Sequence, residues 1–209
     1  GSQYEYDPGL TKTIRREDFT HNVYSMNEDS EGNLWLGMRG TGLRIGADKW
    51  YKNNSKDPNS LSNDQVFSIY RDRKGRMWLG TFGGGLNLAV KTKDGYQFRH
   101  FLQDNYGEKR IRVIEEDKNG RMWVGTNNGI YIFHPDSLIA SPENYIIYNH
   151  VNGTFPNNEI RCLMNDHEGN MWIGTAGAGF AVCHPEGDYQ HLTFNCYDIK
   201  DGLSNAVVQ

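Results

Sequence analysis

The sequence predicts an all-β fold, a β-propeller made of four-stranded antiparallel blades, because a long motif repeats at the period of such a blade. The stretch from Asp72 to Thr81 around Trp78 recurs around Trp35, Trp123 and Trp172. In every copy an Asp stands six residues before the Trp, a Gly three before it and a Gly two after it. The tryptophans are 43, 45 and 49 residues apart. A repeat of about 45 residues with four short strands is typical of a propeller blade.

The expected strands fall at matching places in each copy. A β-branched residue twelve positions before each Trp begins the first and innermost strand (Val23, Val66, Ile111 and Ile160). We expect strands at 23–28, 34–37, 43–45 and 50–51, then 66–70, 77–80, 86–90 and 97–102, then 111–115, 122–125, 130–133 and 145–148, and finally 160–164, 171–174, 180–183 and 191–195.

The repeated residues are the ones that a blade needs for its structure. The Asp begins a four-residue turn, where its carboxylate accepts hydrogen bonds from the following amides, and the Gly that ends the turn supplies a positive φ. The Trp fills the wedge between blades, and the Gly two residues later lets the next blade approach closely. These structural residues are Asp29, Asp72, Asp117 and Asp166 with Trp35, Trp78, Trp123 and Trp172.

The same register divides the chain into units. We expect a tag remnant plus the outer strand of a preceding blade in 1–19, blades at 20–62, 63–107, 108–156 and 157–202, and the first strand of a fifth blade in 203–209. The last segment is suggested by Leu203-Ser-Asn205, which repeats Leu61-Ser-Asn63. We therefore expect a partial propeller whose ends are cut inside blades. Unpaired blade edges favour an open arc or self-association through edges or faces.

Composition excludes several partners. The 209 residues carry a net charge of −4, and the lysines and arginines are scattered, so we expect no nucleic acid partner. No stretch approaches the roughly 20 apolar residues of a membrane helix, so this segment is expected to make no membrane contact. Cys162, Cys183 and Cys196 lack metal-type spacing. We expect buried thiols, with one disulfide left open as an alternative.

The second copy carries a family resemblance. The run NDQVFSIYRDRKGRMWLGTFGGGL at 63–86 resembles the two-component regulator propeller repeat, and the likeness extends over about residues 20–209. The resemblance implies the periplasmic sensor portion of a hybrid two-component histidine kinase of the Bacteroides type, whose parent is anchored in the inner membrane. It also implies a non-enzymatic module that binds an oligosaccharide and signals to a kinase outside this chain. Met38 departs from the pattern, because the other copies have Thr there.

Ligand contacts are expected where the copies differ, because a scaffold repeats and a binding site does not. The loops after strands two and four of each blade emerge on one face, and they carry aromatic, amide and charged side chains suited to stacking on sugars and bonding their hydroxyl or acid groups. The candidate ligand residues there are Arg39, Phe82, Asn127, Asn128, His21, Asp64, Tyr106 and Phe155.

Two arginines on inner strands are a separate candidate. One step into the first strand, the four blades carry Tyr24, Phe67, Arg112 and Arg161. Arg112 and Arg161 are expected either to bind an anionic group or to pair with a neighbouring acid, Glu115 or Glu159.

Catalytic and metal motifs are not found in the sequence. The histidines have no HxH or HExxH spacing, and His134-Pro135 and His184-Pro185 look like turn residues. We expect no catalytic residue, no metal and no cofactor. Two alternatives to glycan sensing stay open: a propeller scaffold that binds protein, and a lyase of the streptogramin-lyase type, which would need a His/Glu cluster with a metal.

Overall fold

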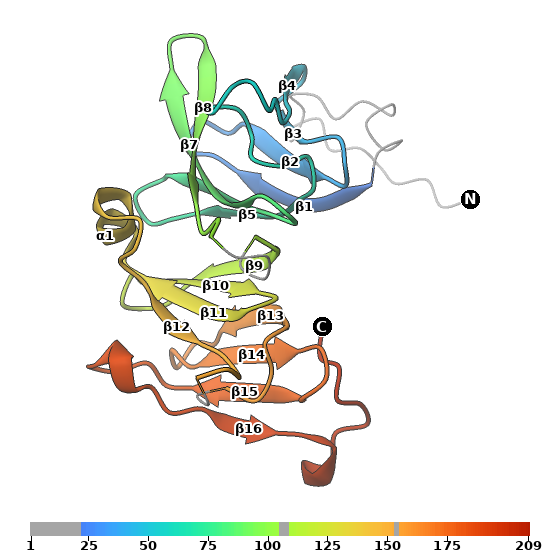
Figure 1. Ribbon diagram of the computed structural model, residues 1–209, viewed down its shortest axis with the longest axis vertical. Coiled ribbons are helices and arrows are strands. Elements are labelled where there is room, and N and C mark those ends of the chain that lie inside the picture. Colours follow the sequence, from blue (N-terminus) through green and yellow to red (C-terminus); the bar gives the residue numbers. More distant parts are fainter. Residues whose placement is uncertain (1–21, 105–108, 153–154) are drawn as a thin grey trace.

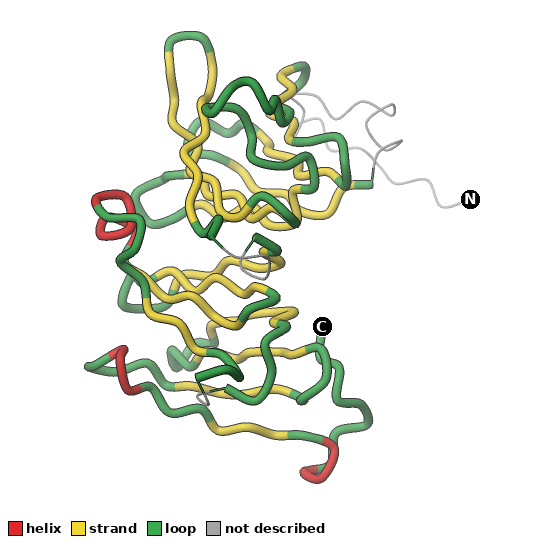
Figure 2. The backbone as a smooth tube through the Cα atoms, in the orientation of Figure 1, coloured by secondary structure: helices red, strands yellow, loops and turns green. Residues whose placement is uncertain are grey.

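The computed structural model describes residues 22–104, 109–152 and 155–209, and these form four antiparallel sheets of four consecutive strands each. The sheets are stacked in chain order, with the first sheet in the upper part of Figure 1 and the fourth at the bottom. Strands dominate and helices are confined to short segments (Figure 2). This is the predicted all-β arrangement of four propeller blades.

The strands follow the predicted positions closely. The first sheet contains β1 (Val23–Glu28), β2 (Leu34–Met38), β3 (Leu43–Ile45) and β4 (Lys49–Tyr51), and the second β5 (Val66–Arg71), β6 (Met77–Thr81), β7 (Gly85–Thr92) and β8 (Gly95–Phe101). The third contains β9 (Ile111–Glu116), β10 (Met122–Thr126), β11 (Gly129–Phe133) and β12 (Ile146–Tyr148), and the fourth β13 (Ile160–Asn165), β14 (Met171–Thr175), β15 (Phe180–Cys183) and β16 (Asn195–Tyr197).

The outer strand of the fourth sheet was predicted wrongly. It was expected at 191–195 but lies at Asn195–Tyr197, after a 3₁₀ turn, η3 (Tyr189–His191). The turn forms because the Asp188 side chain accepts a hydrogen bond from the Gln190 amide. It also places the buried Tyr189 hydroxyl where it donates to Asp117 Oδ2 at 2.6 Å. A contact with the neighbouring blade therefore displaces the strand.

A helix also replaces an expected turn. α1 (Pro135–Ala140) follows β11, with His134 as N-cap and Pro135 in the first turn. Proline at the start of a helix is favourable because its missing amide hydrogen would have no partner there. A second short 3₁₀ turn, η4 (Ile199–Asp201), precedes the C-terminal segment. No strand is assigned within 203–209, although the Val208 amide donates to Thr175 O at 2.9 Å.

Three of the four repeated tryptophans lie between neighbouring sheets, as predicted. Trp35 packs with residues of the second sheet, Trp78 with the third and Trp123 with the fourth, and all three are fully buried. Trp172 is 36% exposed. The first three tryptophans are each covered by the blade that follows, whereas no sheet among the described residues covers Trp172.

The six-residue spacing from Asp to Trp has a direct structural cause. In each blade Oδ1 of the Asp accepts turn amides, while Oδ2 accepts the indole Nε1–H at 2.8–2.9 Å. The glycines that close the turns have φ between +78° and +87°. The carboxylate thus joins the turn to the wedge residue, a link beyond the predicted turn bonding.

The Gly two residues after each Trp is needed for close approach of the next inner strand. A Cβ on Gly80 would lie 2.4 Å from Ile111 Cγ2, and one on Gly125 would lie 2.7 Å from Ile160 Cγ2. The inner strands β1, β5, β9 and β13 pack against one another in series. These glycines therefore set how tightly the blades pack at the inner strands.

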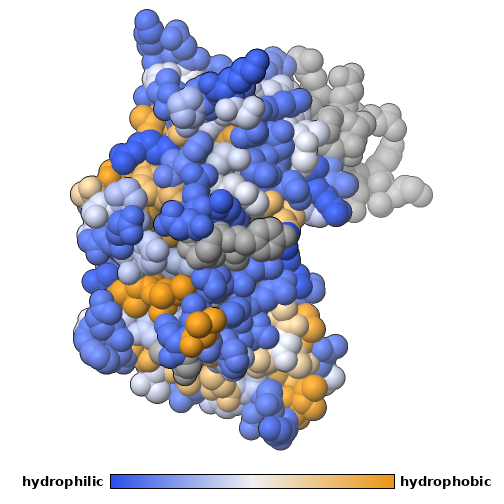
Figure 3. All heavy atoms as spheres, in the orientation of Figure 1, coloured by the Kyte–Doolittle hydropathy of each residue, from blue (hydrophilic) through white to orange (hydrophobic). Residues whose placement is uncertain are grey.

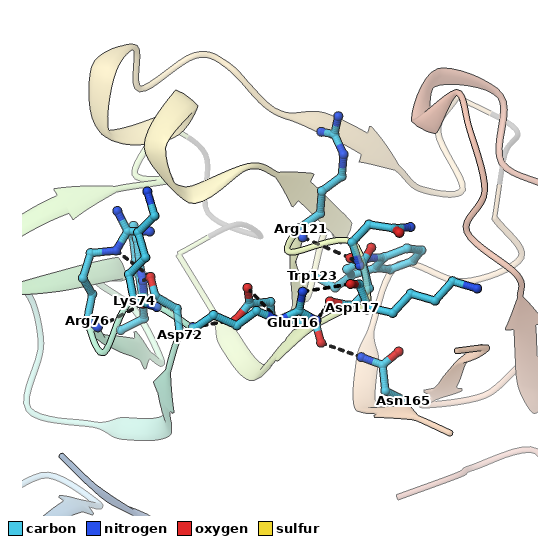
Figure 4. A network of polar contacts seen from close by, with 12 residues as sticks. Asp72, Lys74, Arg76, Glu116, Asp117, Arg121, Trp123 and Asn165 are labelled. Atoms are coloured by element: carbon cyan, nitrogen blue, oxygen red, sulfur yellow. Dashed lines mark hydrogen bonds and ion pairs between the residues drawn. The ribbon is translucent and has the colours of Figure 1, made fainter. Parts of the chain in front are cut away.

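The turns that join the first and second strands carry a polar network at the far end of the inner strands (Figure 4). The Arg73 amide donates to Glu116 Oε2 at 3.0 Å, and Asn165 Nδ2 donates to Glu116 O at 2.6 Å. Arg76 bonds both Asp72 and Asp136. These contacts connect the second, third and fourth blades at this end of the molecule.

The cysteines are free thiols. Cys183 is buried, and burial raises the pKa of its thiol to about 12. Cys162 is half-buried and Cys196 is exposed, so the expectation of a buried thiol fails at Cys196, which lies on the outermost strand β16.

Candidate functional site

One pocket brings together the second residue of every inner strand. Tyr24 on β1, Phe67 on β5, Arg112 on β9 and Arg161 on β13 line it, and Gln209 at the C-terminal end completes it. Its volume is about 280 Å³. We call this the inner-strand pocket. It lies at the end of the inner strands opposite the turn network, because its residues are near the start of these strands and the turns follow their ends.

One side of the pocket is aromatic. The rings of Tyr24 and Phe67 meet edge to face with centroids 4.4 Å apart, and Phe67 stacks on Phe82 at 4.9 Å. Tyr24 is 44% exposed. The Arg39 guanidinium lies 5.7 Å from the Tyr24 ring centroid. Exposed aromatic rings beside a hollow offer a flat apolar surface to a ligand.

The other side is cationic. Arg112 Nη2 lies 3.0 Å and Arg161 Nη2 2.7 Å from the same atom, Glu159 Oε1. The predicted pairing with an acid is therefore made with Glu159. The Arg112 guanidinium also lies 4.8 Å from the Phe82 ring centroid, and that of Arg110 lies 4.9 Å from it. Such contacts hold a guanidinium plane in one orientation.

The two arginines affect each other electrostatically. Burial, and then the charge of Arg161, lower the pKa of Arg112, although attraction to Glu159 opposes this. An arginine keeps its proton at neutral pH even so. The cluster of Arg112, Arg161 and Glu159 consequently carries two positive charges and one negative charge.

The other loop residues singled out in the sequence have different roles. Arg39 and Phe82 lie at the rim through their contacts with Tyr24 and Phe67. Asn128 Nδ2 donates to the Tyr131 hydroxyl at 2.8 Å, which orders its own turn. The Asn127 amide donates to Arg110 O at 3.2 Å, which places Asn127 beside the start of β9.

Asp64 and Phe155 lie away from the pocket. Asp64 Oδ1 accepts from the Asn53 amide at 2.7 Å, so this carboxylate supports a loop of the first blade. Phe155 is only 3% exposed and packs in the core between the third and fourth blades, so the expectation of a ligand-facing ring there does not hold. His21 and Tyr106 lie outside the described residues, as does the outer strand expected in 1–19.

Two residues were not anticipated: Gln209, which lines the pocket, and Arg110, which contacts Phe82 beside it. Arg110 precedes Arg112 by two positions, and alternation along a strand was the signal that it shares that face. Gln209 follows Val208, which matches Val66 in the repeat register, so Gln209 is the counterpart of Phe67. Reading the repeat through to the last residue would have found it.

The part of the chain that the structure describes shows neither a metal-binding cluster nor a membrane-spanning helix. Within 22–104, 109–152 and 155–209, no three His, Cys, Asp or Glu side chains gather as metal ligands would. None of the helices in these ranges is long and apolar enough to cross a membrane. The surface seen in Figure 3 is largely hydrophilic, with separate apolar patches.

Comparison with solved structures gives the fold. The extracellular domain of the hybrid two component system BT3049 from B. thetaiotaomicron aligns over 90% of this chain with a TM-score of 0.68 and 24% identity. PorZ of the type-IX secretion system of Porphyromonas gingivalis aligns over 88% at 0.63 and 16% identity, covering 28% of PorZ. Virginiamycin B lyase from Staphylococcus aureus aligns over 85% at 0.57 and 15% identity, covering 56% of the lyase.

These alignments cover pieces of larger proteins. The chain spans 24% of the BT3049 domain, about a quarter of its length. No curated protein sequence matched this chain.

The family comparison agrees with the blades. The two component regulator propeller family matches residues 19–40, 60–83, 105–128 and 154–177. Each match spans the innermost strand, the Asp turn and the Trp strand of one blade. The chain therefore belongs to the two component regulator propeller family.

Proposed function

We propose that this chain is an extracytoplasmic sensing module, part of a hybrid two-component sensor, and that it binds an oligosaccharide in the inner-strand pocket. It passes the signal to a histidine kinase that lies outside this chain, in a parent protein anchored in the inner membrane and facing the periplasm. The chain itself acts by binding and not by catalysis. Family membership and the similarity in fold to the BT3049 extracellular domain support the sensing role.

The main support for the binding site is that the four blades share the same residues at the turn end but have different residues at the pocket. At the turn end, all four blades repeat the same Asp–Trp hydrogen bond. At the pocket, equivalent positions carry Tyr24, Phe67, Arg112 and Arg161. A frame needs identical residues, whereas a ligand that is not symmetric needs different ones. At these positions of the inner strands the repeat differs from blade to blade.

The chemistry of the pocket suits a sugar. Rings such as Tyr24 stack on the apolar face of a pyranose, and guanidinium groups donate to hydroxyl or acid oxygens. A volume of about 280 Å³ is slightly below the roughly 300–1,000 Å³ of drug-sized ligand pockets. It fits one sugar residue of a longer chain better than several.

Calorimetry against a panel of oligosaccharides tests the proposal, with Tyr24→Ala as the site variant. Loss of a stacking ring is expected to weaken binding about tenfold, since such a contact contributes about 1 kcal/mol beyond its buried area. Trp50→Ala is the matched control, because Trp50 is 41% exposed but lies on the outer strand β4. Heat from no glycan, together with a captured protein partner, would favour the scaffold alternative. Turnover of a sugar or cyclic ester would contradict the non-catalytic role.

A further inference from the structure

We propose that the inner-strand pocket receives an acidic sugar residue, whose carboxylate or sulfate group is bound by Arg112 and Arg161 while its ring lies against Tyr24 and Phe67. This rests on the proposed function, in which the pocket binds an oligosaccharide, and adds the ligand class. The shared chemistry is an anionic oxygen group on a pyranose ring.

The cluster of Arg112, Arg161 and Glu159 has a net positive charge. Glu159 Oε1 accepts a hydrogen bond from Arg112 Nη2 and forms an ion pair with Arg161 Nη2, so one carboxylate is shared by two cations. The side chains of Arg112 and Arg161 are 20% and 28% exposed, so water screens their repulsion only partly. An arriving anion restores the balance of charges at this point.

The guanidinium groups of Arg112 and Arg161 have N–H donors that Glu159 does not use. A guanidinium offers five N–H groups, and Glu159 takes one nitrogen from each arginine. The Nε atoms of Arg112 and Arg161 are buried and have no hydrogen-bond partner among the described residues. Glu159 alone therefore does not satisfy the pair. A purely structural ion pair would need one arginine, and a second one costs free energy unless something compensates it.

The aromatic and cationic sides of the pocket are held together through Phe82. The ring of Phe82 stacks on Phe67 and also contacts the Arg112 guanidinium, so the aromatic and cationic sides are fixed relative to each other. A ligand that needs both an apolar face and an anionic group finds them already in place. A neutral sugar offers the guanidinium groups only hydroxyl oxygens, which accept weaker hydrogen bonds than an anionic group does.

Calorimetry with three matched trisaccharides tests the inference: neutral galactotriose, trigalacturonate and 6-O-sulfated galactotriose. We expect at least one acidic trisaccharide to bind at least tenfold more tightly than galactotriose, and the carboxylate and sulfate arms identify the acid group. Arg112→Gln and Arg161→Gln are each expected to weaken acidic binding by about 10- to 100-fold, as expected for hydrogen bonds to charged groups. Glu159→Gln is expected to tighten it, because a competing carboxylate is removed.

Two further variants keep the test decisive. Arg71→Gln is the matched control, since Arg71 is exposed at the other end of β5 and should leave binding unchanged. If Arg112→Gln fails to fold, Arg112→Lys keeps the charge and loses the planar fork, and an intermediate loss of affinity is expected. Unfolding midpoints measured in parallel separate loss of binding from loss of structure.

The outcomes distinguish the two proposals. Galactotriose binding as tightly as its acidic counterparts, with no effect of either Arg→Gln variant, overturns the acidic-sugar inference and leaves oligosaccharide binding intact. Triglutamate serves as a fourth probe, an anion without a sugar ring. Its binding in the absence of any sugar binding, lost in Arg112→Gln, keeps the anion site and overturns the oligosaccharide proposal. Absence of binding to every probe overturns both.

Discussion

Replacing the wedge tryptophan in two different blades separates the effect of burial from the effect of the repeated hydrogen bond. Trp123 and Trp172 donate to their turn Asp at the same distance, 2.8 Å. Trp123 is fully buried, whereas Trp172 is 36% exposed. A Trp buries about 200 Å², worth about 5 kcal/mol at about 25 cal/mol per Å². Exposure of about a third reduces this by about 2 kcal/mol.

The two Trp→Ala variants should therefore differ clearly. Trp123→Ala is expected to lower the free energy of unfolding by about 3–5 kcal/mol, because it also leaves a closed cavity. Trp172→Ala is expected to cost about 2 kcal/mol less, since water fills the space. Urea unfolding followed by far-UV circular dichroism measures both.

Two Trp→Phe variants provide the same comparison if a Trp→Ala variant does not fold. Trp123→Phe removes the indole donor from Asp117, which is fully buried, and is expected to cost about 1–3 kcal/mol. Trp172→Phe is expected to cost less than about 1 kcal/mol, because water can reach Asp166 in its place. Equal costs within either pair would refute the view that each Trp is stabilised by the blade that follows it.

Three other predictions concern the frame and the thiols. Gly80→Ala is expected to lower the free energy of unfolding by about 1–3 kcal/mol, because the added methyl group would overpack against the next inner strand. Gly177→Ala is the control and should be nearly neutral, since Gly177 lies in a loop and the nearest atom is 3.7 Å from its Cβ position. Equal unfolding midpoints of the two variants in urea would count against close approach at Gly80. Hydrogen bonds from its Trp and turn partners lower the pKa of Asp166 below its ordinary value, so its stabilisation is present above about pH 4 and lost as pH falls. Asp166→Asn should thus destabilise more at pH 7 than at pH 2.5, and a larger effect at pH 2.5 would contradict this. Cys196 should react with a thiol reagent in the folded protein before Cys183, as mass spectrometry of labelled peptides would show, and the reverse order would place Cys196 inside.

Much of the fold could be read from the sequence because each blade repeats the same local interactions. The turn Asp, the wedge Trp and the close-approach Gly lie within a few residues of one another in the sequence. Together they determine the positions of the first three strands of a blade. The outer strand has no such residues. In the fourth blade its position depends on Tyr189, whose hydroxyl reaches Asp117 in the neighbouring blade. A long-range contact of this kind leaves no periodic signal.

The pocket was accessible from the sequence in part. Alignment of the repeats makes Tyr24, Phe67, Arg112 and Arg161 equivalent, and equivalent positions of adjacent inner strands must lie near one another. The loops were harder, because a loop position does not determine which way a side chain turns. Phe155 follows a strand as a surface residue would, but its ring packs against Phe194 with centroids 5.1 Å apart.

The central claim is that the repeated residues form the frame and that the varied inner-strand residues bind the ligand. A crystal structure with trigalacturonate bound tests it most directly. The account predicts one carboxylate within hydrogen-bond distance of Arg112 and Arg161, and its sugar ring against Tyr24 and Phe67. A ligand bound at the turn network around Asp72 and Glu116, or an inner-strand pocket left empty at saturating ligand, would contradict it.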